Sequence, residues 1–292
     1  MKHKKTSLGG IFTLLIGTLI AMTAAQPSAC APSSANHTEK PPTIETTQQQ
    51  TKNLPLEATK PIVDIPSPLT AKPIEGEIML VREGYTSSYN PFTRQPNYVC
   101  WTLTTTRLNG NAKRDNVFRA DPDLDDKIKS TLDDYKNSGF SRGHMCPAAD
   151  NKWSKNAMRE SFYLSNICPQ TQSLNGGDWE DLESACRDWV EDRGVTLHIV
   201  CGPLFDSDKP RRLKKHVAVP SGFFKAIICL DKGNEKGIAF IYQNNTDRSR
   251  PMSNYVCTID SVEKLSGFDL FHNVAAKTQQ RIEKQADLND WQ

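Results

Sequence analysis

Two short segments of the chain carry side chains suited to cleaving a phosphodiester bond. Residues 139–147 (GFSRGHMCP) place His144 two positions after Arg142, and residues 174–179 (LNGGDW) place Asn175 before an acidic helical segment. A neutral imidazole can take a proton from water, and a guanidinium matches the shape of a phosphate. An amide oxygen suits a hard cation such as Mg²⁺. Together the two segments predict a general base and a metal ligand acting on one phosphate.

Each of these residues also has a simpler interpretation. An Arg-Gly-His tripeptide occurs in ordinary surface loops, and an asparagine at a helix start often serves as an N-cap that needs no metal. Glu183 follows Asn175 by eight positions, which is about 12 Å along a straight helix. That separation predicts that Glu183 orders water in the hydration shell of the cation, and does not bind the cation directly beside Asn175.

Other basic residues could contact a phosphate. Arg114 and Arg119 lie in the polar segment 113–119 (KRDNVFR), and either guanidinium could stabilise charge that develops in the transition state. Alternatively, both could pair with the acidic residues of the nearby segment 121–126 (DPDLDD). The basic segment 209–215 (KPRRLKK) is a candidate phosphate-attracting patch, and an ordinary solvated loop explains it equally well.

Hydrophobic periodicity predicts the elements that must position these residues. Residues 98–105 alternate as a strand, and residues 178–191 form an amphipathic helical pattern that Gly194 would end. A short strand or turn is expected at 141–145, a polar loop at 85–96, and a loop with a short helix at 121–135. The remaining predictions are strands at 78–82, 195–201, 217–219, 223–230 and 236–242, and helices at 155–162 and, last, 260–266. This pattern indicates a mixed α+β domain.

The N-terminal segment predicts export. Residues 1–6 contain three lysines, and the apolar run 8–25 ends in small residues, so residues 1–30 read as an export signal. Two routes of maturation are open: lipidation of Cys30, as in a bacterial lipoprotein, and simple cleavage near Ala25. The chain is accordingly expected to be secreted, periplasmic or anchored to a membrane as a lipoprotein.

A change in composition separates this signal from the folded domain. Residues 31–75 are rich in Pro, Thr, Gln, Ser and Lys, and they carry too little apolar surface to offset the entropy of ordering. They are predicted to form a disordered tether, and residues 76–292 to form the domain. Seven cysteines follow Cys30, so at least one thiol is unpaired within a monomer. The chain has no CxxC pair, which argues against a cysteine zinc site.

The net charge gives no general sign of nucleic-acid binding. Removal of residues 1–25 leaves 33 basic and 34 acidic residues, without the basic excess of many nucleic-acid-binding proteins. Any attraction for phosphate must therefore come from a local patch.

The order of the motifs resembles the DNA/RNA non-specific endonucleases, the family that contains the Serratia-type nuclease and mitochondrial endonuclease G. The likeness extends from about residue 78 to residue 271, which is nearly the whole predicted domain. It rests on short segments in one order: 97–103, 142–144, 151–154, 162–170, 174–179, 202–205, 219–225 and 260–263.

The resemblance implies a ββα-metal (His-Me finger) core within a mixed, largely antiparallel sheet domain. It implies that His144 activates a water molecule and that Asn175 holds one Mg²⁺ ion, for which Mn²⁺ could substitute. Glu183 would order the other waters on this ion, and Arg114 would stabilise the developing charge. The products of DNA or RNA hydrolysis would carry 5′-phosphates.

From their guanidinium groups, Arg142 and Arg119 are predicted to bind the substrate. The resemblance exposes one departure. The family commonly has aspartate where this chain has Ser141, which puts a supporting carboxylate beside His144 in doubt. Two rival functions stay open: a surface lipoprotein that captures nucleic acid without cutting it, and a phosphodiesterase for small phosphoesters. The sequence implies no protein partner, and a homodimer is neither indicated nor excluded.

Overall fold

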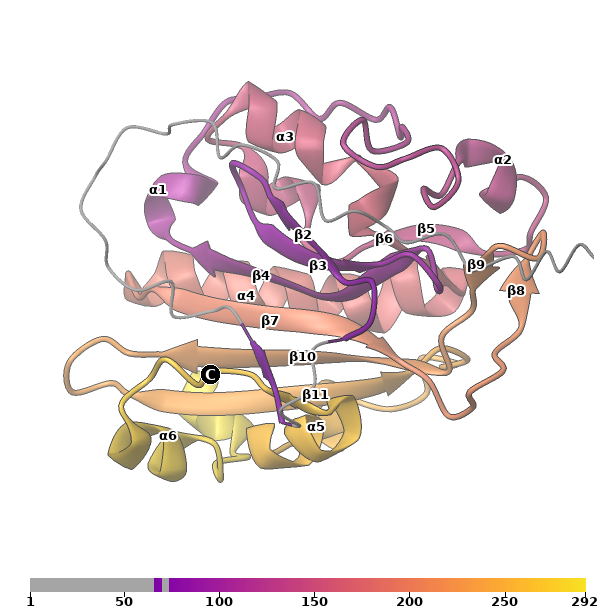
Figure 1. The fold of residues 1–292 in the computed structure, drawn as a ribbon. Coiled ribbons are helices and arrows are strands. Elements are labelled where there is room, and N and C mark those ends of the chain that lie inside the picture. Colours follow the sequence, from indigo (N-terminus) through magenta and orange to yellow (C-terminus); the bar gives the residue numbers. More distant parts are fainter. Residues whose placement is uncertain (1–65, 70–73) are drawn as a thin grey trace, which may run out of the picture. The chain divides into compact units, whose positions relative to one another are not determined.

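An antiparallel sheet of seven strands organises the part of the chain that the computed structural model describes, residues 66–69 and 74–292. Its strand order is β12-β11-β10-β7-β4-β3-β2 (Figure 1). The described residues all belong to one unit, Leu56–Gln292. The strands of this sheet are β2 (Ile78–Val81), β3 (Thr86–Asn90), β4 (Gln95–Leu103), β7 (Leu197–Leu204), β10 (Gly222–Cys229), β11 (Lys236–Gln243) and β12 (Val256–Cys257).

Helices cover both faces of the sheet. Along β4, Val99 and Trp101 pack into the same apolar cluster as Trp179 of the long helix α4, whereas Tyr98 packs into a second cluster with Ile259 of α5. This alternation is the two-residue period of a strand, and it divides the core into two layers. Figure 1 shows α4 along the sheet and α5 and α6 beside β10 and β11. The helices are α1 (Thr105–Leu108), α2 (Leu132–Tyr135), α3 (Lys155–Ser161), α4 (Trp179–Arg193), α5 (Ile259–Ser266) and α6 (Ala276–Ile282).

A separate two-stranded unit leads into α4. β5 (Ser141–His144) pairs antiparallel with β6 (Ile167–Gln170), and His144 lies opposite Ile167. The indole Nε1 of Trp179 donates to the carbonyl of His144 at 3.2 Å, which ties the end of β5 to the first turn of α4. Two antiparallel strands followed by a helix packed against them confirm the α+β class and the predicted ββα core.

Several predicted elements are confirmed, but the segment predicted as a loop at 85–96 contains a strand. The predicted strands of the large sheet, the short strand at 141–145 and the helix at 178–191 are present, and Gly194 ends α4 with a positive φ of 65°. Residues 85–96, however, contain strand β3. Its Ser and Thr residues lack the usual apolar alternation, but β2 and β4 supply hydrogen-bond partners on both sides. Ser88 is fully buried there and donates to the carboxylate of Glu77.

Two further boundaries differ from prediction. The helix at 260–266 is not the last, because α6 follows it. Ile282 is the one buried residue of α6, and no side-chain hydrogen bond caps its N-terminus, so its sequence signal is weak. The predicted tether also ends too late, because β1 (Ser67–Pro68) pairs with β13 (Phe268–Asp269). Pairing with β13 in this two-stranded sheet gives Ser67 and Pro68 an order that the composition of the segment does not predict.

The predicted export signal, Cys30 and the segments 31–65 and 70–73 lie outside the described residues. Within the described part, none of the helices is long and apolar enough to cross a membrane. No two of the described cysteines form a disulfide, and six of these seven residues are buried. One short hairpin completes the fold, formed by β8 (Arg212–Leu213) and β9 (Val217–Ala218).

Candidate active site

The candidate general base stands at the end of β5 in an aromatic enclosure. The His144 ring packs against Phe162 in an edge-to-face contact, with 4.9 Å between the centroids, and against Phe118 at 5.3 Å. Only 9% of the residue is exposed, and its buried Nε2 has no hydrogen-bond partner among the described residues. Burial, reinforced by the positive charges of Arg114 and Arg142, lowers the pKa of His144 to about 3. The imidazole is therefore neutral at physiological pH, which is the form that accepts a proton.

The same two phenylalanines hold the candidate arginines. The guanidinium of Arg142 lies over the Phe118 ring, 4.4 Å from its centroid, and that of Arg114 lies over Phe162 at 5.1 Å. Arg114 also donates from Nε to Asn116 at 2.9 Å. Each ring thus contacts both His144 and one cation, and both charges lie close enough to act on the imidazole.

The backbone of β5 at Gly143 lies directly against the side chain of Gln170, next to His144. A Cβ atom on Gly143 would lie 1.9 Å from Oε1 of Gln170, the fully buried residue at the end of β6. A side chain at this position would therefore have to displace Gln170 or β5. The Gln170 amide, which has no hydrogen-bond partner for either Oε1 or Nε2 among the described residues, fills the volume beside the base.

One open cleft of about 1000 Å³ brings the predicted residues together. Its lining includes His144 and Arg142 of β5, Arg114 of the segment between α1 and α2, Asn175 of the turn Leu174–Asp178, and Glu183 of α4. The predicted base, metal ligand and carboxylate therefore face one volume, as their roles require.

Arg119 is the predicted site residue that does not line this cleft. Its guanidinium pairs with Asp115 at 2.6 Å, whereas Asp121, a member of the acidic segment expected to hold it, is bound by Arg82. Its backbone pairs with the segment at Phe162 and Leu164. A role of Arg119 in substrate binding stays a prediction without support from this geometry.

The turn that carries Asn175 is not the simple helix start predicted from the sequence. Leu174–Asp178 forms a π-helical turn that departs from helical geometry at Gly177, so Asn175 and Glu183 do not share one straight helix. The estimate of about 12 Å along an axis therefore does not apply to this pair. The N-cap of α4 is Asp178, and its carboxylate accepts from Thr246 instead of capping the helix. Asn175 makes no cap and is left to face the cleft.

Ser141, the departure from the family pattern, lies at the start of β5. Its hydroxyl donates to Oε1 of Gln172 at 2.7 Å, and both residues line the cleft. The Gln172 amide in turn approaches Gly176, where a Cβ atom would lie 2.8 Å from Nε2. Ser141 thus positions the turn that holds Asn175 through a neutral hydrogen bond, without the charge that aspartate would bring.

Burial and the charged side chains next to Glu183 set the pKa of its carboxyl group. Burial raises the pKa of Glu183 to about 7, Lys225 and Arg187 oppose this shift, and Asp150 adds to it. Lys225 of β10 is 1% exposed, and its ammonium lies over the rings of Trp179 at 4.5 Å and Trp101 at 5.6 Å. Burial lowers the pKa of Lys225, but Glu183 and its other neighbours raise it above the ordinary value, so the ammonium stays charged.

Asp150 links these charged side chains to the cleft wall. It accepts from Trp101 Nε1 at 3.1 Å and pairs with Arg187 at 3.3 Å, and Arg187 lines the cleft together with Glu183. Sequence reasoning missed Asp150, Arg187 and Lys225. Two signals were available: Arg187 follows Glu183 by four positions on the helix, and Lys225 interrupts an apolar strand.

Comparison with known proteins identifies the family to which the chain belongs. The family model for DNA/RNA non-specific endonucleases matches residues 66–277. The chain belongs to this family. Among the curated members, human mitochondrial endonuclease G is 34% identical over 209 residues, with 67% of this chain and 70% of that protein covered. A nuclease from Nostoc sp. is 33% identical over 219 residues, covering 72% and 78%.

Other members of the family match in sequence or structure. The mitochondrial nuclease EXOG of Xenopus laevis is 37% identical over 201 residues, and the match spans 63% of this chain and 55% of that protein. A chain in the crystal structure of the EndoG/EndoGI complex has a TM-score of 0.62 at 26% identity, covering 68% of this chain and 88% of that chain. Membership in the DNA/RNA non-specific endonucleases supports an endonuclease activity that uses a divalent cation.

Proposed function

We propose that this chain is a Mg²⁺-dependent, sugar-non-specific endonuclease that hydrolyses phosphodiester bonds in DNA and RNA and leaves 5′-phosphates. The observation that carries the proposal is a buried, neutral histidine in one cleft with Asn175 and Glu183. In this proposal His144 accepts the proton of the attacking water. The ring contacts with Phe118 and Phe162 hold the imidazole in place, so little reorganisation is needed when the proton moves.

The cationic side chains of the cleft supply the attraction for phosphate. Arg142 and Arg114 lie beside the base, and Arg187 lies beside Glu183. Guanidinium groups bind phosphate oxygens in a planar, two-pronged geometry. Arg114 would stabilise the charge that develops on the phosphate oxygens as the bond to water forms, which is the role its sequence position suggests.

The donor atoms of the cleft fit a hard cation. Asn175 offers an amide oxygen and Glu183 a carboxylate, and no cysteine lines the cleft. Oxygen donors in small number suit Mg²⁺, which keeps several waters, and Mn²⁺ could substitute. When bound, the cation would neutralise charge on the phosphate and stabilise the leaving 3′ oxygen. Asn175 would hold it directly, and Glu183 would accept hydrogen bonds from its waters.

The surroundings of the cleft favour a polymer over a small phosphoester. The basic segment 209–215 lies at its edge: Arg211 stacks on Phe140 at 5.3 Å, and Lys214 pairs with Asp133 at 2.8 Å. Phe140 and Asp133 both line the cleft, so the segment extends its positive surface. A protein that only captures nucleic acid has no need of a neutral, buried imidazole, which argues against that rival.

Digestion of a supercoiled plasmid and of an RNA transcript tests the proposal. The purified protein should nick both substrates with Mg²⁺ and cease to do so in EDTA, and end-labelling should detect 5′-phosphates. His144→Ala should lose most cleavage, on the order of 10²- to 10⁴-fold, while still binding nucleic acid. Asn175→Ala should need more Mg²⁺ for half-maximal rate. Cleavage that persists in EDTA, or full turnover by His144→Ala, contradicts the proposal.

For location we propose export, from the basic and apolar composition of residues 1–30. Several related nucleases carry mitochondrial names, so the destination of this chain needs its own measurement. Intact-mass analysis of the mature chain distinguishes a lipid on Cys30 from simple cleavage near Ala25. A mature chain that retains residues 1–25 would overturn the export proposal.

A further inference from the structure

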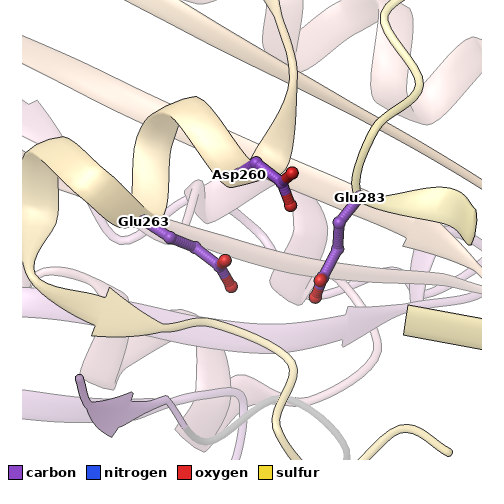
Figure 2. A group of neighbouring side chains, drawn as sticks. All are labelled: Asp260, Glu263 and Glu283. Atoms are coloured by element: carbon purple, nitrogen blue, oxygen red, sulfur yellow. The ribbon is translucent and has the colours of Figure 1, made fainter. Parts of the chain in front are cut away.

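Three carboxylates converge on the face of the sheet opposite α4. Asp260 and Glu263 lie on α5, and Glu283 follows the last residue of α6 (Figure 2). One oxygen from each lies within 4.8 Å of the others. The amide of Asp260 donates to the carbonyl of Glu283 at 3.2 Å, so the backbone holds the two helices at this point. The cluster is thus the junction of α5 with the C-terminal segment.

Glu283 makes this cluster unlike an ordinary acidic surface. It is 6% exposed, and its Oε1 is buried with no hydrogen-bond partner among the described residues. A buried carboxylate oxygen without a donor is costly. The usual remedy, an ion pair with a basic side chain, is absent for all three carboxylates within the described part of the chain.

The charges around the cluster increase this cost. Asp269 adds a fourth carboxylate nearby, and its Oδ1 accepts from Gln279 at 2.8 Å. Glu263 has one compensating contact, because its Oε1 accepts from the amide of Leu270 at 2.9 Å. The Gln279 side chain also hydrogen-bonds the Glu283 carboxylate, and Oε1 of Glu283 stays without a partner among the described residues, open to a ligand of opposite charge.

We propose that Asp260, Glu263 and Glu283 bind a divalent cation of the Ca²⁺ class that fastens α6 to α5. Ca²⁺ accepts six to eight oxygen ligands at variable angles, and carboxylates bind it through one or both oxygens. Three carboxylates with water meet this requirement. Mg²⁺ demands a strict octahedron and gives up water reluctantly, so it fits a flexible all-carboxylate cluster less well. This site is separate from the catalytic cleft, because the sheet lies between α4 and α5.

The proposal predicts that the ion stabilises the C-terminal segment. A ligand that binds only the folded chain raises stability by an amount that grows with its concentration. Without the ion, the three carboxylates repel one another, so removal of one charge should help the fold. With the ion, removal of the same charge should harm it. This reversal separates a cation site from a cluster that is merely acidic.

Calorimetric titration and thermal unfolding of the metal-stripped full chain test the proposal, in an Asn175→Ala background that weakens the catalytic site. At pH 8, CaCl₂ should bind saturably to one site and raise Tm. Glu283→Gln should weaken Ca²⁺ binding by at least about tenfold, a change of about 1.4 kcal/mol. In EGTA this variant should melt above its parent, and in CaCl₂ below it.

A matched control and two further variants keep the test decisive. Glu191→Gln removes an exposed carboxylate of α4 and should leave Ca²⁺ binding unchanged. Asp260→Asn and Glu263→Gln should each weaken Ca²⁺ binding. These two variants test the cation site even if Glu283→Gln does not fold. An equal Ca²⁺-induced rise in Tm with and without the Glu283 charge overturns the proposal, as does the absence of saturable binding in the parent.

Discussion

The buried ammonium of Lys225 opposes the effect of burial on the carboxyl of Glu183, whose pKa lies at about 7. Lys225 comes from the middle of β10 and Glu183 from α4, so this charge balance links the sheet to the cleft. Two tryptophan rings enclose the ammonium and exclude water from it. The ionisation of Glu183 near neutral pH therefore depends on a residue that does not line the cleft.

Lys225→Met tests this dependence. Methionine keeps the length of the side chain and removes its charge, so the pKa of Glu183 should rise further and less of it should be ionised at pH 7. If the pKa of Glu183 rises by one unit, kcat/KM at pH values below the new pKa should fall by up to about tenfold. Rates measured from acidic to alkaline pH should show the acid limb moving to higher pH.

A double-variant comparison supplies the control for Lys225→Met. In a Glu183→Gln background, Lys225→Met should not shift the acid limb of the pH–rate profile, because the titrating carboxyl group of Glu183 is absent. Lys225→Met should also lower Tm, since it leaves Asp150 and Glu183 buried with less compensating charge. An unchanged pH profile in Lys225→Met would show that Lys225 does not set the pKa of Glu183.

The pH dependence of the wild-type rate should report Glu183 and not His144. Burial keeps the pKa of His144 at about 3, so its protonation contributes nothing at ordinary pH. In the proposed mechanism Glu183 holds the waters of the cation as an ionised carboxylate, so kcat/KM should fall as pH drops below about 7. Raising the Mg²⁺ concentration should shift this limb to lower pH, because a nearby cation favours the carboxylate. A limb that survives in Glu183→Gln would assign it to another group.

The same carboxyl should influence stability with a defined sign. The folded-state pKa of Glu183, about 7, lies above its ordinary value of 4.5. Its contribution to stability is therefore present below pH 4.5 and is lost as pH rises through 7. In metal-free protein at pH 8, Glu183→Gln should be more stable than wild type, by on the order of 1 kcal/mol or more. Urea unfolding at pH 5 and pH 8 measures this, and an equal difference at both pH values would contradict it.

Gly143 and Gln170 form a steric pair that two substitutions can separate. Gly143→Ala would place Cβ 1.9 Å from Gln170 Oε1, so either the buried Gln170 side chain or β5, with the adjacent His144, must shift. Overpacking of this kind costs about 1–3 kcal/mol, and activity should fall with stability. Adding Gln170→Ala should restore much of both, whereas Gln170→Ala alone serves as the control. If the double variant does not melt at a higher temperature than Gly143→Ala, the contact with Gln170 is not the cause of the lost stability.

The sequence predicts that His144, Asn175 and Glu183 act at one site, and the fold places all three in the lining of one cleft. The sequence could not show that burial between Phe118 and Phe162 sets the state of the base. That environment joins β5 to a loop and to the end of α3, and only the folded chain brings them together.

The errors in prediction share this tertiary origin. The polar strand β3 is held by its two neighbours, and its own side chains give no apolar alternation. The kink at Gly177, which separates Asn175 from the axis of α4, accommodates Arg248 from a distant loop: a Cβ at 177 would lie 2.5 Å from that side chain. Asp150 and Lys225 each look like isolated charges in the sequence, and their partners appear only across the sheet and α4.

The two arginines of segment 113–119 should separate into different roles when each is replaced by alanine. Arg114 lines the cleft beside His144, so Arg114→Ala should lower kcat/KM by about 10²- to 10³-fold, in the range of one lost transition-state contact. Arg119 is outside the lining and pairs with Asp115 at 2.6 Å. Arg119→Ala should lower stability by up to about 1 kcal/mol, less at high salt, and leave the rate near wild type. Steady-state kinetics and Tm at low and high salt distinguish these effects; a comparable loss of rate in both variants would restore Arg119 to substrate binding.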